Sequence, residues 1–163
     1  MGEYGTRHWP EVMAEKLQQQ GVTIDLKVGA QDESGYVATG RTHDRVFAER
    51  IPELVQPSTQ LIVLFGSAND MNTPADELSA AVQQTLTAAK TAAPNSRVLV
   101  IGPAWATTEP PQELVTVRDI LQSGAEDVGA TFVDPIAEGW FVDHADLLDA
   151  DGTNPTDAGH RYL

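Results

Sequence analysis

Five consecutive apolar residues, Leu61–Phe65, constrain the fold of this chain more than any other stretch. A run without apolar–polar alternation is typical of a strand that is buried on both faces, as in parallel sheets. The strand is expected to stop at Gly66, and a short polar loop then brings Asn69 and Asp70. Ligands of open α/β sheets bind beyond the carboxyl ends of the strands, so this pair is expected where chemistry takes place. The alternative is that both residues only form a turn before the next helix.

Composition restricts the class of protein. The chain has 163 residues, enough for one domain with a real core, and a net charge of -14 from 24 acidic and 10 basic residues. This charge argues against nucleic acid and anionic membrane surfaces, whose binding needs Lys and Arg. The absence of cysteine excludes disulfides, thiolate nucleophiles and Cys-ligated metals. No stretch approaches the roughly 20 apolar residues of a membrane helix, and the first residues are polar. We therefore expect a soluble protein without a signal peptide in this chain, whose compartment the sequence does not identify.

Helical and strand patterns alternate along the chain. Amphipathic or capped segments predict helices at 9–20, 44–55, 73–93 and 114–128, the third opened by Thr73 as the cap and Pro74 at the first helical position. Apolar runs predict strands at 22–28, 60–65, 97–101 and 131–133. Strands that alternate with helices indicate right-handed parallel crossovers. The predicted fold class is therefore α/β, a three-layer α/β/α sandwich around a parallel sheet.

Three motifs follow one another in an informative order: 33–36 (Glu-Ser-Gly-Tyr), 66–70 (Gly-Ser-Ala-Asn-Asp) and 151–160 (Asp-Gly-Thr-Asn-Pro-Thr-Asp-Ala-Gly-His). On these motifs the chain resembles the SGNH hydrolases, also called the GDSL esterase/lipase family, over almost its whole length. The resemblance implies a flavodoxin-like sheet and a serine esterase or lipase that needs no cofactor and no metal. It also implies that the Gly35 N–H and the Asn69 amide bind the oxyanion, and that Asp151 orients the catalytic base.

Two departures from the family pattern concern the catalytic triad. The Gly-Asp-Ser block with the nucleophilic serine does not occur in this sequence, and neither does the central strand that carries it. Asn154 stands where the family has its catalytic His, so Asp151 has no imidazole to orient. An Asn side chain cannot accept a serine proton at neutral pH. Asn154 also suits the N-cap of a helix with Pro155 at its first position.

Other polar residues have simpler interpretations. His160 matches a second, non-catalytic His of the family, which implies a structural role. His144 lies in an acidic loop from which it could swing toward the site, although a solvated loop residue is expected, and His8 and His43 are expected at the surface. Ser34 has no paired base, so it is not expected to act as a nucleophile.

An acidic cluster near the last motif offers oxygen ligands of the kind that divalent cations bind: Asp149, Asp151 and Asp157. Acidic residues are also favoured at the start of a helix, and this second interpretation is preferred. We therefore expect no metal site and no cofactor.

Two functions remain open. The first is an SGNH-type serine esterase, with residues 1–163 forming one domain that is incomplete at both ends as numbered. The second is a catalytically inactive SGNH-fold domain that binds an acylated glycan or a cell-wall component; Asn154 favours it, because truncation does not explain an internal substitution. The expected ligand is accordingly a small-molecule ester or an acylated glycan. We also expect the space between 22–28 and 60–65 to be filled by residues outside this numbering or by another chain, because unpaired strand edges are costly to bury.

Overall fold

A three-stranded parallel sheet forms the centre of the computed structural model, which describes residues 8–41, 44–150, 152 and 154–163. Its order is β1 (Leu61–Phe65), β2 (Arg97–Ile101) and β3 (Thr131–Val133). In register, Leu61 lies opposite Arg97 and Leu99 lies opposite Thr131. The apolar runs predicted these three strands and their parallel direction correctly.

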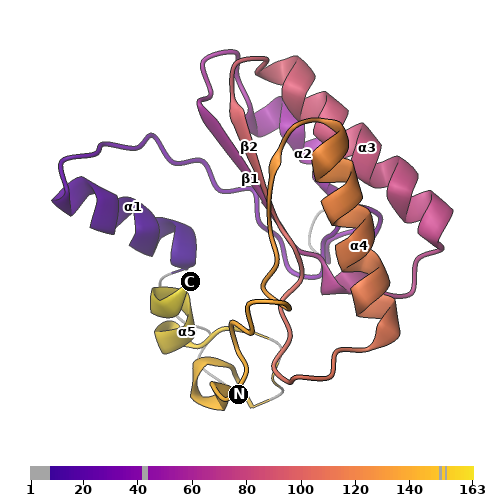
Figure 1. Ribbon diagram of the computed structural model, residues 1–163. Coiled ribbons are helices and arrows are strands. Elements are labelled where there is room, and N and C mark those ends of the chain that lie inside the picture. The colour runs from indigo at the N-terminus through magenta and orange to yellow at the C-terminus, as the bar shows by residue number, and fades with distance from the viewer. Residues whose placement is uncertain (1–7, 42–43, 151, 153) are drawn as a thin grey trace.

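Helices lie on both sides of the sheet. Figure 1 shows α2, α3 and α4 on one side and α1 and α5 on the other, so the predicted three-layer α/β/α arrangement is confirmed. The α-helices span Trp9–Gln19 (α1), Phe47–Leu54 (α2), Ala75–Ala92 (α3), Gln112–Asp127 (α4) and Asp157–Tyr162 (α5), and two 3-10 turns span Ala68–Asp70 (η1) and Ala145–Leu147 (η2). Within the described part of the chain, no helix combines the length and the apolar character that a membrane crossing requires.

The core lies mainly between the sheet and the α3–α4 layer. Leu86 of α3, Val100 of β2 and Leu121 of α4 are fully buried. Gly124 allows α3 and α4 to approach closely, because a Cβ atom at this position would lie 2.6 Å from Val82 Cγ1. On the opposite face, the ring of Phe65 lies 6.0 Å from that of Trp9 and 6.2 Å from that of Trp140. These aromatic rings join α1 and the loop after β3 to the end of β1.

Residues 22–28 do not form a strand, so the prediction for this segment is wrong. Val22 and Val28 are 49% and 41% exposed, so the alternating apolar side chains are not covered by a packed layer. An alternating pattern becomes a strand only where a neighbouring strand pairs with it, and no described residue provides one.

One edge of β1 has no strand beside it in the described part of the chain. The Gly66 N–H donates to β2 at 3.1 Å, which shows that even-numbered residues here direct their backbone groups toward β2. The backbone groups on the opposite edge therefore belong to Leu61, Val63 and Phe65. Segment 22–28 is not hydrogen-bonded to this edge, and the expectation that another segment fills the space stays a prediction.

Two predicted helix caps differ from those in the structure. Helix α3 begins one residue late, with Pro74 rather than Thr73 as its N-cap, because Pro74 has an extended ψ of 138°. Helix α5 is capped by Thr156, whose Oγ1 accepts a hydrogen bond from the Gly159 N–H at 3.2 Å. Asn154 is not the cap, because Pro155 after it forms an antiparallel bridge with Leu148.

Candidate active site

The loop around Gly35 and the loop after β1 meet at the carboxyl end of the sheet. Asn69 Nδ2 donates a hydrogen bond to the Ser34 carbonyl at 3.0 Å, and Ser67 Oγ donates to the same oxygen at 3.4 Å. The Asn69 N–H in turn donates to Ser67 Oγ at 3.1 Å. The structure therefore brings together the two residues that the sequence analysis assigned to the oxyanion, Gly35 and Asn69.

Gly35 occupies a position that no side chain can share. A Cβ atom at Gly35 would lie 2.6 Å from both Ser67 Oγ and Asp70 Oδ1. Its N–H donates to the Ala38 carbonyl at 2.8 Å, so in this conformation the backbone donor is engaged within its own loop. The amide of Asn69 carries two hydrogens, and its bond to Ser34 uses one of them.

Asp70 lies inside the protein, fully buried, rather than at the open edge of the sheet. Its carboxylate accepts three backbone hydrogen bonds from the neighbouring loop: Tyr36 N at 2.9 Å, Val37 N at 3.1 Å and Ala38 N at 2.8 Å. Burial, and next the charge of Asp70, raise the pKa of the buried Tyr36 phenol far above its usual range. The sequence analysis missed this carboxylate–backbone contact, because backbone N–H donors leave no trace in residue identity.

Asn154 lies in a different environment, an exposed loop that closes on itself. Its Nδ2 donates to Asp149 Oδ2 at 3.0 Å, and its backbone N–H donates to Asp149 Oδ1 at 3.3 Å. The Asp149 N–H returns a bond of 2.8 Å to the Asn154 carbonyl. Asp151 lies outside the described residues. Among those that are described, no hydrogen bond joins this loop to the Gly35–Asn69 site.

The described histidines lie against other elements. His160 Nδ1 accepts a hydrogen bond from the Trp9 N–H at 3.2 Å, and its ring lies 5.2 Å from that of His8. Burial, and next the proximity of His8, lower the pKa of His160. His144 is exposed at the start of η2, with its ring 5.7 Å from that of Tyr162. His43 lies outside the described residues.

The structure describes two members of the acidic cluster. Asp149 bonds to Asn154, Asp157 lies in the first turn of α5, and Asp151 is outside the described residues. Within the described ranges, no three His, Cys, Asp or Glu side chains gather in a way that could hold a metal ion.

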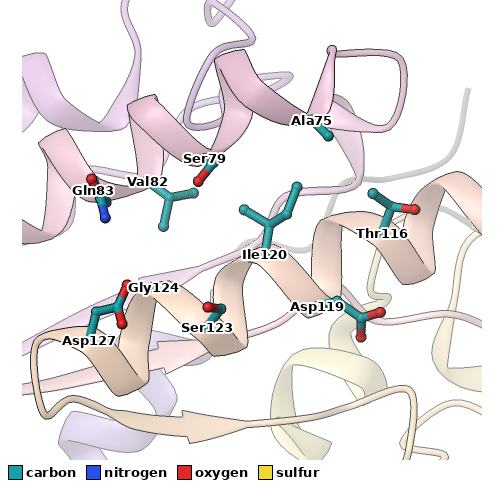
Figure 2. A pocket seen from close by; sticks show the side chains of 10 residues that line it. All are labelled: Ala75, Ser79, Val82, Gln83, Thr116, Asp119, Ile120, Ser123, Gly124 and Asp127. Carbon is teal, nitrogen blue, oxygen red and sulfur yellow. The ribbon is translucent and has the colours of Figure 1, made fainter.

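A groove of about 300 Å³ lies between α3 and α4, away from these residues. Figure 2 shows Ser79 and Val82 of α3 facing Ile120 and Ser123 of α4 across it. None of the predicted site residues lines this groove, so it is separate from the candidate active site.

The sequence of this chain is similar to those of known proteins. The profile of the GDSL-like lipase/acylhydrolase family matches residues 1–162. The GDSL lipase Rv0518 of Mycobacterium tuberculosis is 39% identical over 165 residues, which cover 99% of this chain and 71% of that protein.

Solved structures resemble the fold at low sequence identity. A protein from Lactobacillus plantarum superposes with a TM-score of 0.72 at 17% identity, covering 99% of this chain and 85% of the other. A carbohydrate esterase family 3 protein from Talaromyces cellulolyticus superposes with a TM-score of 0.60 at 18% identity, covering 98% and 86%. Because the family profile spans the chain and the mycobacterial relative matches it over nearly its whole length, this protein belongs to the GDSL-like lipase/acylhydrolase family, the SGNH hydrolases.

Proposed function

We propose that this chain forms the oxyanion-binding part of an SGNH-type carboxylic ester hydrolase. The observation that carries the proposal is the contact of the Asn69 amide with the Ser34–Gly35 loop at the carboxyl end of β1. The Asn69 amide carries a second hydrogen that the bond to Ser34 does not use, and a donor held in place in this way suits the charge that develops on an ester carbonyl oxygen. The relatives in the same family support ester substrates as the class.

The proposed reaction requires two groups that this sequence does not have at the family positions. In the family mechanism a serine oxygen attacks the ester carbonyl, and a histidine accepts the serine proton. No Gly-Asp-Ser occurs among the 163 residues, and Asn154 stands at the position of the histidine. Asn69 would bind the oxyanion, and Gly35 would add its N–H only after releasing the Ala38 carbonyl.

The test is hydrolysis of 4-nitrophenyl acetate by two preparations. One is the 163-residue chain, and the other carries whatever residues the gene encodes before Met1. We expect the second preparation to hydrolyse the ester if those residues include Gly-Asp-Ser and another group replaces the missing base. Asn69→Ala should then lower the rate by about 10²–10³-fold, the loss typical of one oxyanion donor. Gln122→Ala removes an exposed amide on α4 and serves as the matched control. An unchanged rate in Asn69→Ala would contradict the proposal.

The bonding of Asn154 favours a second candidate, a catalytically inactive domain that binds an acylated glycan. The amide of Asn154 is committed to Asp149 and does not offer a base. Acetylated xylo-oligosaccharide, titrated into the ¹⁵N-labelled chain, should shift the Asn69 side-chain amide signals, and the deacetylated sugar should not. Equal shifts with both sugars, or none, would argue against this candidate.

A further inference from the structure

The carboxylate of Asp70 joins two segments that are more than thirty residues apart in the chain. It lies on η1, directly after Asn69, and accepts hydrogen bonds from three consecutive N–H groups of the 36–38 segment. Its side chain is fully buried, and no ion pair to it is recorded among the described residues. Successive backbone N–H groups that converge on an anion form a concave site of this kind. The negative charge of Asp70 is therefore compensated by the loop that carries Gly35.

The same carboxylate fixes how close the two segments come. Both oxygens of Asp70 lie in the space that a Cβ atom of Gly35 would occupy. Tyr36 N bonds to Oδ2, whereas Val37 N and Ala38 N bond to Oδ1. Because Asn69 precedes Asp70 directly, a rigid Asp70 also limits where the Asn69 amide meets the Ser34 carbonyl.

We propose that Asp70 is a positioning residue of the esterase site, whose carboxylate holds the Gly35 loop in register with the Asn69 amide. The inference rests on the proposed function for the role of Asn69. Charge-assisted hydrogen bonds are stronger than neutral ones, and three of them converge here in a buried location. Asp70 does not touch substrate in this arrangement; it acts through Gly35 and Asn69.

The two carboxylate oxygens of Asp70 accept different numbers of backbone hydrogen bonds, and this difference gives the test a specific expected result. Asp70→Asn keeps the shape but replaces one oxygen with an NH₂ group, which cannot accept a hydrogen bond. The favoured orientation keeps the oxygen that serves Val37 and Ala38 and turns the NH₂ group toward the Tyr36 N–H. We therefore expect the Tyr36 amide to lose its partner while the other two amides keep theirs.

The experiment is NMR on the ¹⁵N-labelled 163-residue chain. In Asp70→Asn, amide exchange at Tyr36 should accelerate at least about tenfold relative to Val37 and Ala38, and the Asn69 side-chain amide signals should shift. Asp134→Asn is the matched control, because Asp134 Oδ1 accepts backbone bonds from Ile136 and Ala137 at 3.1 and 3.0 Å after β3. This control should leave the Tyr36 and Asn69 signals in place.

Three outcomes would overturn the proposal. The first is unchanged Tyr36 and Asn69 signals in Asp70→Asn, which would leave Asp70 with a role in stability alone. The second is an equal response in Asp134→Asn. If Asp70→Asn does not fold, amide hydrogen exchange in the unsubstituted chain tests the proposal instead. Tyr36, Val37 and Ala38 must then exchange more slowly than Thr39, whose N–H has no recorded acceptor among the described residues, and equal exchange is the third overturning outcome.

An activity measurement separates this inference from the proposed function. In any preparation that hydrolyses 4-nitrophenyl acetate, Asp70→Asn should lower kcat more than it raises KM, because positioning of an oxyanion donor matters most in the transition state. If Asn69→Ala leaves hydrolysis unchanged, the proposed function fails, whereas the NMR signals still decide whether Asp70 positions the loop.

Discussion

The two halves of the candidate active site are held in opposite ways. In the Gly35–Asn69 half, Gly35 and Asp70 are buried although Asn69 itself is exposed, and the hydrogen bonds join residues 32 to 35 positions apart. The Asn154 half is exposed, and its amide bond to Asp149 joins residues only five positions apart. A long-range contact forms only when the whole fold forms, whereas a local contact within an exposed loop depends little on the rest of the molecule. The arrangement of Gly35 and Asn69 therefore depends on the whole fold, whereas we expect substitutions in the loop of Asn154 to cost little stability.

The largest effect expected from this contrast concerns catalysis. The 163-residue chain should hydrolyse 4-nitrophenyl acetate at a rate indistinguishable from buffer. Nucleophile and base act as a unit in serine hydrolases, and losing either one costs on the order of 10⁶-fold in kcat. A spectrophotometric assay of released nitrophenol checks this. Asn154→His should not rescue the chain as written, but should raise the rate by orders of magnitude once a Gly-Asp-Ser segment is present.

One result of that assay would directly contradict the contrast between the Gly35–Asn69 half and the Asn154 half. Robust hydrolysis by the unmodified chain that Asn69→Ala abolishes would mean that the nucleophile or the base is a residue we have not assigned. An inactive preparation that also fails a folding check by circular dichroism would not count as the expected outcome.

The second effect concerns the closely packed glycine. Gly35→Ala should lower the free energy of unfolding by about 1–3 kcal/mol, the range for an added methyl group in a packed site. The reason is that a Cβ atom would enter the space of Ser67 and Asp70. Urea denaturation followed by circular dichroism measures the change. Gly129→Ala is the control for adding a methyl group where nothing lies within 4 Å, although its positive φ of 65° adds strain of its own. If Gly35→Ala lowers the free energy of unfolding no more than Gly129→Ala does, the 34–38 loop rearranges easily around the added methyl group.

The sequence predicted the apolar runs that pair with one another as strands. The runs 61–65, 97–101 and 131–133 form the parallel sheet, although only the middle strand is buried along most of its length and the last has no buried residue. Segment 22–28 was mispredicted because alternation describes only one covered face and does not supply a pairing partner. Asn154 was mispredicted as a cap because Thr156, two residues later, also suits capping and bonds to the Gly159 N–H.

The candidate site was predicted as a set of residues but not as a set of contacts. The motifs placed Gly35 and Asn69 together, and their loops do meet. The hydrogen bonds of Asp70 were not predicted, because its partners are backbone N–H groups of residues whose side chains do not indicate the bond. One signal was available, namely a carboxylate directly after Asn69 at the end of a buried strand.

A pH effect of intermediate size is expected where α1 meets α5. Burial and His8 lower the pKa of His160 below its ordinary value near 6.5, so the unfolded chain binds a proton there more readily than the folded one. The bond from the Trp9 N–H to Nδ1 also requires the neutral ring. Of the nearby carboxylates, Glu11 on α1 and Asp157 on α5 oppose the shift without cancelling it. The stabilising contribution is thus complete above the unfolded pKa and is lost as the pH falls below about 6.5 toward the lower folded pKa.

Urea denaturation at pH 7.5 and at pH 5.5 measures this contribution. The free energy of unfolding should decrease more between these two pH values in the unsubstituted chain than in His160→Gln. His144→Gln is the control, since the recorded ring contact of His144 is with Tyr162. If His160→Gln keeps the full pH dependence, the contact between α1 and α5 does not depend on the neutral ring.

The smallest effect is also the sharpest comparison, because it makes the same substitution in both halves of the site. Asn69→Ala removes the donor of a part-buried hydrogen bond to the Ser34 carbonyl, although Asn69 itself is exposed, and should cost about 1 kcal/mol of unfolding free energy, the usual net value of such a hydrogen bond. Asn154→Ala removes an amide that bonds to Asp149 at the surface, where substitutions usually stay within about 0.5 kcal/mol. Paired urea denaturation curves measure both values under one condition. A loss in Asn154→Ala that equals or exceeds the loss in Asn69→Ala would mean that the loop of Asn154 is a structural element in its own right. The Asn at this position would then be explained by folding stability, and not by tolerance of an exposed loop to change.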